Sequence, residues 1–434
     1  MWSWLPSPRG CASSGGGAED VAERSWPLGR GHGLQKLRAN FTIYKVWIER
    51  TALPRLRDLA AQRPVVLLTG ARQVGKTRLV RRAFPDHRYV SLDLPSEAAR
   101  ADHDPEAFLK LHPPPVVVDE VQYAPGLFRH LKAVVDRDRD RVGQFILTGS
   151  QKLPLMSSVS DSLAGRAAVF ELEGLTWAEI HAARPELSLE DVVVRGGFPE
   201  LYERPELDAA AWYRAYVATY LERDVRELMA VGSLRDFERL VRAAALRSGS
   251  LLNKAELARD VGVSPPTANA WLSVLEASNQ VVLLEPWFSN RTKSVVKSPK
   301  LYFADSGLCA FLMGVEDGRG LLHAPLGGAL WETMVFAQLR RQQSNARGAW
   351  SLWFWRDRTR EADFLLHRGG RFDLADAKLT AQPTERDIDR LRDVAERLPG
   401  GRVESLSIFC RTEARFPLGR DGVARPIDDA WPPS

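Results

Sequence analysis

Residues 65–77, VVLLTGARQVGKT, decide the fold of this chain. The apolar run Val65–Thr69 predicts a buried strand, and the following TRLVRRAF has the apolar spacing of a helix. Between them, Gly70–Thr77 fits the pattern GxxxxGK[ST]. Glycines let such a loop aim successive backbone N–H groups inward, and the next helix adds the positive end of its dipole. The stretch therefore predicts a loop that holds a phosphate group chiefly by its main chain.

Every residue of this loop is expected to contact a nucleotide: Gly70, Ala71, Arg72, Gln73, Val74, Gly75, Lys76 and Thr77. In such loops the lysine reaches the outer phosphates, and the hydroxyl of the last residue binds Mg²⁺. ATP and Mg²⁺ are thus the expected ligands. A glycine-rich turn of no function is the alternative, and the strand before the loop and the helix after it argue against that alternative.

A second motif follows one strand later. Val116–Glu120, VVVDE, predicts a buried strand that ends in two carboxylates, as in a Walker B segment. Asp119 is expected to hold the magnesium shell and Glu120 to act as general base toward the attacking water. The intervening strand, Tyr89–Leu92, indicates the ATPase subclass with a strand inserted between the two motifs.

Two further positions are candidates for the same site. The strand Phe145–Thr148 is followed by Ser150, which is expected beside the γ-phosphate, although serine and threonine also favour such turns for capping alone. Arg166, at the end of SLAGR (162–166), is the candidate cation for transition-state charge, supplied within the chain or by a neighbouring subunit. The alternative for Arg166 is an ordinary surface arginine.

The predicted strands, 65–69, 89–92, 116–118, 145–148 and 168–172, alternate with helical stretches, which is typical of a doubly wound α/β sheet. A length of 434 residues predicts about three domains. We expect a flexible extension (1–44), a P-loop core (45–175), a helical lid (176–245), a winged-helix-like region (246–325), an α/β region (326–415) and a tail (416–434). Within these, Tyr44–Ala61 and Trp212–Met229 are expected to be helical.

Composition limits the class of protein. Hydrophobic residues make up 44% and charged residues 26% of the chain, and no apolar run approaches the roughly 18 residues that span a bilayer, so a cytoplasmic protein without a membrane partner is expected. The three cysteines, Cys11, Cys309 and Cys410, are too far apart for a zinc site and are expected to be reduced. A net charge of +5 permits a nucleic-acid partner without arguing for one.

Taken in order, the motifs resemble a widespread family of bacterial and archaeal AAA-type ATPases, related to the signal-transducing NTPases, that carry a C-terminal domain of unknown function. The resemblance spans Tyr44–Cys410 and rests on GARQVGKT (70–77), VVVDEVQ (116–122), FILTGSQ (145–151), SLAGR (162–166), GGFPE (196–200), YLERDV (220–225) and PKLYFADSGL (299–308). In that family the C-terminal domain is thought to resemble the PD-(D/E)xK restriction-endonuclease fold.

The residues after 326 support that comparison. Gly369-Gly370 predicts a two-residue hairpin turn, whose register places Asp363 opposite Asp376 and Glu361 opposite Lys378 on one face. Facing carboxylates require a cation between them, either Lys378 or a divalent metal. Glu332, on the preceding helix, is expected to complete a Mg²⁺ or Mn²⁺ site with Asp363 and Asp376. Ala362 and Asp376 depart from the usual nuclease signature, and a structural cluster of ion pairs is the alternative.

The winged-helix-like region is a poor candidate for reading bases. Ser264–Glu285 contains neither lysine nor arginine, so a packing or partner-docking role is favoured, with Trp271, Leu272 and Leu275 as core. The stretch Arg291–Lys300 has four basic residues and no acid. It is therefore the better candidate for phosphate contacts, and a solvated hairpin is its alternative.

The sequence predicts an ATP-binding AAA-type protein that hydrolyses ATP and whose nucleotide state moves the lid and winged helix relative to the nuclease-like region. Two alternatives stay open. One is an ATP-gated, metal-dependent nuclease acting on DNA or RNA. The other is a slow regulatory or scaffolding switch whose output is the binding of a protein partner or of a second copy.

Overall fold

The computed structural model describes residues 47–150, 155–156, 159, 161–221, 234–288, 298–346 and 350–431. Lys45–Ser434 forms one compact unit, to which all of these described residues belong. The predicted extension (1–44), most of the basic stretch Arg291–Lys300 and most of the motif YLERDV lie outside the described residues.

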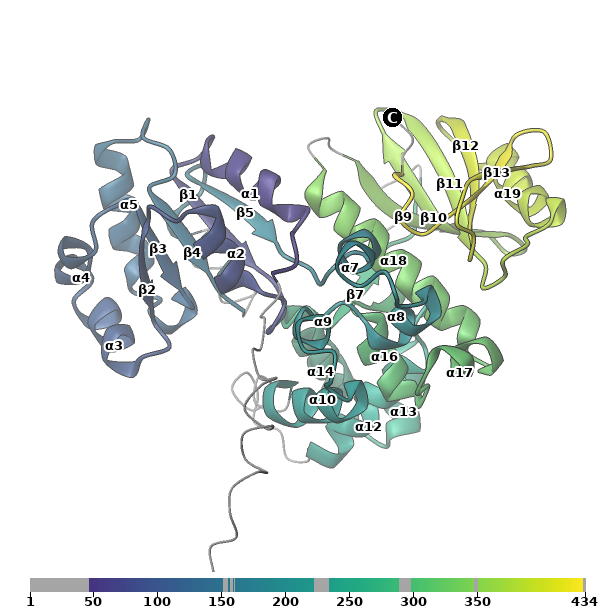
Figure 1. Cartoon of the computed structure of the whole chain (residues 1–434), viewed down its shortest axis with the longest axis horizontal. Coiled ribbons are helices and arrows are strands. Elements are labelled where there is room, and N and C mark those ends of the chain that lie inside the picture. The colour runs from purple at the N-terminus through teal and green to yellow at the C-terminus, as the bar shows by residue number, and fades with distance from the viewer. Residues whose placement is uncertain are drawn as a thin grey trace, which may run out of the picture. The chain divides into compact units, whose positions relative to one another are not determined.

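The first part of the unit is a five-stranded parallel sheet. It consists of β1 (Val65–Thr69), β2 (Arg88–Ser91), β3 (Val116–Asp119), β4 (Phe145–Thr148) and β5 (Ala167–Glu171) in the order β2-β3-β4-β1-β5 (Figure 1). Each strand lies within one residue of its predicted ends. All five strands are parallel, so their carboxyl ends, including that of β1 before the loop, meet at one edge.

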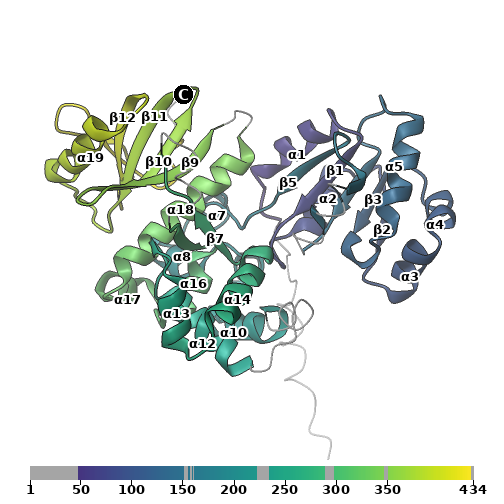
Figure 2. The ribbon, with the colours of Figure 1, turned by 180° about the vertical axis from the view of Figure 1, so that it is seen from behind.

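Helices cover both faces of this sheet, since alternate residues of β1 enter different cores. Val66 and Leu68 share a hydrophobic cluster with α1 (Ala52–Ala60) and α2 (Lys76–Ala83). The opposite face, with Val65 and Leu67, packs against α4 (Pro105–Leu111) and α5 (Leu127–Arg137). Figures 1 and 2 show these two helical layers, with α3 (Pro95–His103) beside α4. The predicted helix Tyr44–Ala61 is shorter than expected, because its described part forms a helix only from Ala52.

A largely helical region follows β5. Its elements are α7 (Trp177–Ala183), α8 (Leu189–Arg195), α9 (Glu200–Glu203), α10 (Ala209–Tyr216), α12 (Leu234–Ala245), α13 (Lys254–Val261), α14 (Pro265–Ala277), α16 (Ser306–Met313) and α17 (Gly318–His323). A three-stranded antiparallel sheet, β6 (Ser250–Leu251), β8 (Lys300–Phe303) and β7 (Val281–Leu284), lies among them with β8 in the centre.

Two predictions for this region have different outcomes. The long α-helix expected from Trp212 ends at Tyr216, where the chain passes into a π-helical turn, Val217–Leu221. The expected helix–turn–helix–strand order is present: Gly262, with φ +82°, ends α13, and the Ser264 hydroxyl accepts the Thr267 N–H (3.2 Å) to begin α14. Assignment of this region to the winged-helix fold stays a prediction.

The C-terminal part is a six-stranded sheet with two helices. The helix α18 (Gly327–Asn345) precedes β9 (Ser351–Arg356), β10 (Glu361–Arg368), β11 (Arg371–Ala377), α19 (Glu385–Arg397), β12 (Arg402–Phe409), β13 (Phe416–Leu418) and β14 (Gly422–Arg425). The strand order is β13-β14-β12-β11-β10-β9. Residues 416–425 were expected to be part of a tail, and this expectation is wrong because β14 pairs in parallel with β12 inside the sheet.

Packing is continuous across the boundaries that composition predicts. One hydrophobic cluster contains Leu68 of β1, Leu201 of α9, Leu275 of α14 and Phe336 of α18. The helix α18 is buried on nearly all sides and contacts α1, α8, α16, β8 and β11. Among the described residues, no helix combines the length and the apolar character that crossing a membrane requires.

Candidate functional site

The loop after β1 depends on two glycines. Gly70 has φ +143°, and a Cβ atom there would lie 2.2 Å from the carbonyl oxygen of Leu172, just beyond β5. Gly75 has φ +95° and stands at the N-terminus of α2. Both conformations are ones that side-chain-bearing residues rarely adopt. The loop therefore lies tightly against the chain that leaves β5 and ends at the positive end of α2.

Lys76 lies folded over this loop. Its side chain is buried, and Nζ donates to the carbonyl oxygens of Gly70 and Ala71, both at 2.9 Å. Lys76 also lines a cleft of about 630 Å³ together with Arg72, Gln73, Gly75 and Thr77. Five of the eight loop residues expected to contact the nucleotide thus line one open space, whereas Ala71 and Val74 line a separate cavity.

Asp119, at the end of β3, accepts hydrogen bonds from three hydroxyl groups. One carboxylate oxygen accepts the hydroxyls of Thr77 and Tyr89, both at 2.7 Å, and the other accepts that of Thr148. Burial and the bond to Asp119 raise the pKa of Tyr89, so its phenol remains a donor. Thr77 and Asp119, the residues predicted for Mg²⁺, therefore lie together. Their oxygen atoms fit this ion, which is usually bound by one or two protein ligands plus phosphates and water.

Glu120 is turned toward the cleft by an unusual backbone conformation. Its φ of +57° and ψ of +47° are left-handed, and its N–H donates to the Thr148 hydroxyl at 3.2 Å. The carboxylate accepts the Gln122 amide and, at 3.4 Å, the Ser150 hydroxyl. Glu120 lines the same cleft as Lys76 and Thr77. The predicted base and the predicted γ-phosphate residue are therefore neighbours.

Part of the cleft wall comes from residues to which the sequence assigned no role. The centre of the Trp47 ring lies 5.4 Å from the guanidinium carbon of Arg78, and Arg78 pairs with Glu203 of α9. Pro199 and Arg204, beside α9, complete this side of the cleft. The motif GGFPE (196–200) was the available signal, since it places Pro199 in a segment that the resemblance singled out.

Arg166 does not lie in the cleft of its own chain. It directly precedes β5, and its guanidinium pairs with Asp136 at 2.6 and 2.9 Å. A five-residue strand is about 16 Å long, so Arg166 stands at the sheet edge opposite the loop. A catalytic role within the chain is therefore wrong, and a role at a neighbouring subunit's site stays a prediction.

A buried arginine fastens the loop to the chain beyond β5. Arg50 donates to the carbonyl oxygens of Val74 (2.9 Å), Glu173 (2.7 Å) and Gly174 (3.2 Å). Its Nε lies 3.4 Å from Glu179, whose carboxylate also accepts the backbone N–H groups of Thr51 and Thr176. Arg50 and Glu179 are both buried.

A second group of titratable residues lies in the C-terminal part. The predicted turn is present, because Arg368 pairs with Arg371 across Gly369-Gly370 and the pairing continues to Phe364 and Ala375. The ladder does not extend to Glu361 and Lys378, whose pairing stays a prediction. The Asp363 N–H donates to Asp376 (3.0 Å), and the Ala377 N–H donates to Asp363 (3.2 Å). Lys378 lies 3.4 Å from Asp376. We refer to Glu332, Glu361, Asp363 and Asp376 as the carboxylate cluster.

Lys300 of β8 occupies the middle of the carboxylate cluster. Its Nζ lies 3.1 Å from Glu332, 2.5 Å from Glu361 and 3.1 Å from Asp363, and the residue is 2% exposed. Burial opposes the charge of this ammonium, but the surrounding acidic side chains raise the pKa of Lys300 well above its usual value. Burial and the charge of Asp363 raise the pKa values of Glu332 and Asp376 to about 7.

This arrangement differs from the predicted metal centre. Glu332, Asp363 and Asp376 lie together as expected, but within the described residues no group of three or more histidine, cysteine, aspartate or glutamate side chains is arranged to hold a metal ion. The expected neutraliser, Lys378, contacts Asp376, whereas Lys300 lies between Glu332 and Asp363. Lys300 was expected to contact phosphates as part of the basic stretch Arg291–Lys300, and its place in the motif PKLYFADSGL (299–308) was the signal that could have indicated another role.

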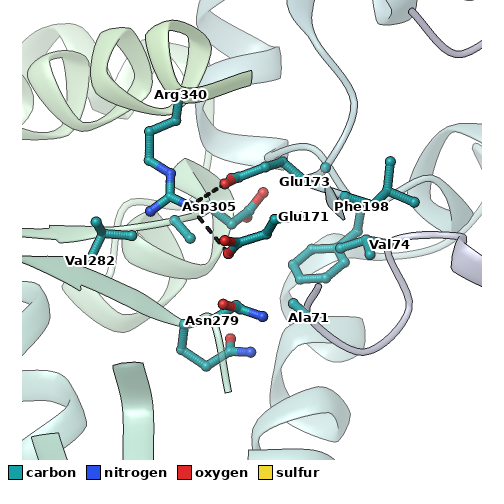
Figure 3. A pocket seen from close by; sticks show the side chains of 13 residues that line it. Ala71, Val74, Glu171, Glu173, Phe198, Asn279, Val282, Asp305 and Arg340 are labelled. Carbon is teal, nitrogen blue, oxygen red and sulfur yellow. Dashed lines mark hydrogen bonds and ion pairs between the residues drawn. The ribbon is translucent and has the colours of Figure 1, made fainter. Parts of the chain in front are cut away.

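The helix α18 approaches both sites. Arg340, two turns beyond Glu332, pairs with Glu171 (3.2 Å), the last residue of β5, and with Glu173 (2.5 Å) just beyond it (Figure 3). These residues border a cavity of about 20 Å³ that Ala71 and Val74 of the loop also line. The helix α18 therefore contacts the end of β5, beside the P-loop, through Arg340, and contributes Glu332 to the carboxylate cluster.

Family models match the sheet of β1–β5, the largely helical region and the C-terminal part separately. A sequence model described as an AAA domain matches residues 62–181, and models of two domains of unknown function, DUF8612 and DUF4143, match residues 186–319 and 327–429. The chain is thus an ATP-binding protein with a P-loop domain of the AAA class.

Relatives along most of its length place the chain in a family. The uncharacterized proteins Rv2008c of Mycobacterium tuberculosis and Mb2031c of Mycobacterium bovis are each 34% identical to it over 384 residues, covering 87% of this chain and 83% of theirs. The chain belongs to the family of these mycobacterial proteins.

Two solved structures are similar in part. The Walker-type ATPase PABY2304 of Pyrococcus abyssi matches 61% of this chain and 96% of its own, with 17% identity and a TM-score of 0.43. The RuvB Holliday junction branch migration motor of Thermotoga maritima matches 54% of this chain and 90% of its own, with 17% identity and a TM-score of 0.29.

Proposed function

We propose that this chain hydrolyses ATP in the cleft between its P-loop and α9. The observation that supports the proposal is the grouping of Lys76, Thr77 and Glu120 along one cleft of about 630 Å³. A cleft that brings together a phosphate-binding loop, a hydroxyl for magnesium and a carboxylate has the parts that attack of water on a phosphate requires.

Each residue has a distinct role in this proposal. The N–H groups of residues 70–77 and the Lys76 ammonium bind the phosphates, for which Lys76 exchanges its two carbonyl contacts for phosphate oxygens. Thr77 and Asp119 would hold Mg²⁺, which supplies positive charge against the developing negative charge. Glu120 accepts a proton from the attacking water, and Ser150 and Gln122 orient its carboxylate.

The test compares Lys76→Ala and Glu120→Gln. Lys76→Ala should abolish ATP binding, measured by calorimetry. Glu120→Gln should keep the Kd within a few-fold and lower the turnover of ATP by about 10²-fold or more, because the amide cannot take a proton. Glu106→Gln is the matched control, since this exposed glutamate of α4 pairs with the equally exposed Lys110 at 2.9 Å and should leave both quantities unchanged.

Two results would contradict the proposal. If Glu120→Gln loses binding as completely as Lys76→Ala, Glu120 is not the base. If the wild-type chain binds ATP with Mg²⁺ but releases no phosphate above the Glu120→Gln background, the cleft binds nucleotide without hydrolysing it.

We also propose that the nucleotide state acts on the C-terminal part through α18. Support comes from Arg340, which pairs with Glu171 and Glu173 beside the loop, and from Glu332 on the same helix. A regulatory switch fits this arrangement better than a nuclease, because the carboxylate cluster already contains Lys300. Cleavage of labelled DNA or RNA with Mg²⁺ or Mn²⁺ that Asp376→Ala abolishes would favour the nuclease instead.

A further inference from the structure

The carboxylate cluster draws its acids and its cation from different parts of the chain. Glu332 comes from α18, Glu361 and Asp363 from β10, and Lys300 from β8 of the separate three-stranded sheet. All three acids place an oxygen within 3.1 Å of the Lys300 Nζ. An ammonium that contacts three carboxylates in a buried position takes the place that a divalent ion has in an oxygen-rich site.

Side-chain cations already offset most of the negative charge around this position. Lys300, Lys378 and Arg356, which lies 3.2 Å from Glu361, face the four acids of the cluster. Tyr302, on the same strand as Lys300, donates its hydroxyl to Glu332 at 2.5 Å and so uses a further acceptor position. A divalent ion bound to Glu332, Glu361 and Asp363 would have to displace the Lys300 ammonium, which would then be buried without these three partners.

Lys300 is also held where it is by its strand. It lies at the start of β8, which pairs with β6 on one side and β7 on the other, and its Nζ lies 5.7 Å from the Phe354 ring. The chain after β7 continues into contact with β9, where the Trp287 N–H donates to the Phe354 carbonyl (2.7 Å) and the Phe354 N–H donates to that of Glu285 (3.2 Å). Lys300 therefore belongs to a strand that is paired on both sides, in a sheet that is hydrogen-bonded to β9 through the residues after β7.

We propose that Lys300 is the resident cation of the carboxylate cluster, so that this cluster is a metal-free ionic junction between β8 and the C-terminal sheet. The junction replaces the divalent-metal centre that the acids alone would form. The inference does not rest on ATP hydrolysis, since it concerns a different group of residues.

The test counts Mn²⁺ bound to the full chain without nucleotide, by electron paramagnetic resonance of the free ion. Five proteins are compared: wild type, Asp363→Asn, Lys300→Met, the double variant of Lys300→Met with Asp363→Asn, and the control Lys300→Arg. Wild type and Asp363→Asn should bind equal amounts of Mn²⁺. Lys300→Met should bind one more ion per chain, and the added Asp363→Asn should remove it. Lys300→Arg, which keeps the charge, is the control and should match wild type.

The proposal fails in either of two ways. It fails if wild type binds an Mn²⁺ ion that Asp363→Asn loses, because the metal would then share the cluster with Lys300. It also fails if folded Lys300→Met gains no ion. The first comparison needs no variant of Lys300, so the proposal can be overturned even if Lys300→Met does not fold. A melting temperature of wild type that EDTA leaves unchanged to within about 1 °C would support it.

Discussion

Replacing Arg50 by methionine removes the side chain that fastens the P-loop to the chain beyond β5. The substitution keeps most of the apolar volume but deletes three hydrogen bonds to the carbonyl oxygens of Val74, Glu173 and Gly174. It also leaves the buried Glu179 carboxylate without its cation.

The expected cost follows from burial. Removing one partner of a buried ion pair typically costs about 3–5 kcal/mol. The backbone N–H groups of Thr51 and Thr176 still donate to Glu179, so we place Arg50→Met at the lower end, about 3 kcal/mol. ATP affinity should fall as well, because Val74 belongs to the loop.

The neighbouring residue provides a matched control. Glu49 pairs with Arg82 at 3.1 Å, but the two side chains are 69% and 55% exposed. An exposed pair of this kind is worth less than about 1 kcal/mol, so Glu49→Gln should be nearly neutral. Urea denaturation of both variants measures the difference, and calorimetry measures the ATP Kd. If Arg50→Met costs no more than Glu49→Gln, the fastening role assigned to Arg50 is wrong.

Three other outcomes are expected. Gly70→Ala should lower the free energy of unfolding by at least about 2 kcal/mol in thermal or urea denaturation, because its Cβ would lie 2.2 Å from the Leu172 oxygen; a neutral result would contradict the loop geometry. Burial raises the pKa of Cys309 to about 12 and that of Cys410 to about 11, so iodoacetamide at pH 8 should modify both thiols in urea and neither in the native chain, as read by peptide mass spectrometry. Asp376, with its pKa raised to about 7, holds a proton between about pH 4 and 7 that the unfolded chain releases, so native stability falls as pH rises through this window. Asp376→Asn should lessen that fall, to which Glu332 also contributes, as read by urea denaturation across pH, whereas parallel pH curves for variant and wild type would contradict the assignment.

Local patterns explain what the sequence could predict. The P-loop and the segment VVVDE were found because each role depends on neighbours in the chain, and the structure brings Thr77, Asp119 and Glu120 to one cleft or its edge. The proximity of Asp363 and Asp376 could be predicted from the Gly369-Gly370 turn, since a two-residue turn fixes the pairing of the strands that it joins.

The missed residues depend on contacts between distant segments. Arg50, Tyr89 and Lys300 find their partners 123, 30 and 63 residues away, and no spacing rule connects such positions. A role for Arg166 within its own chain could have been ruled out from the sequence, since its position before a parallel strand sets it at the edge opposite the loop. The short strands β13 and β14 escaped notice because three or four residues are too few for a clear alternation of polar and apolar side chains.

The position of Lys300 determines what a shortened form of this protein would show. If the chain is cut between β8 and α18, the C-terminal fragment keeps Glu332, Glu361 and Asp363. It loses the Lys300 ammonium that all three contact. Such a fragment would have to take up protons or dissolved metal to offset its acids. Manganese uptake by the fragment would therefore reflect the truncation, and a nuclease assay on it would describe a molecule with a different charge from that of the intact protein.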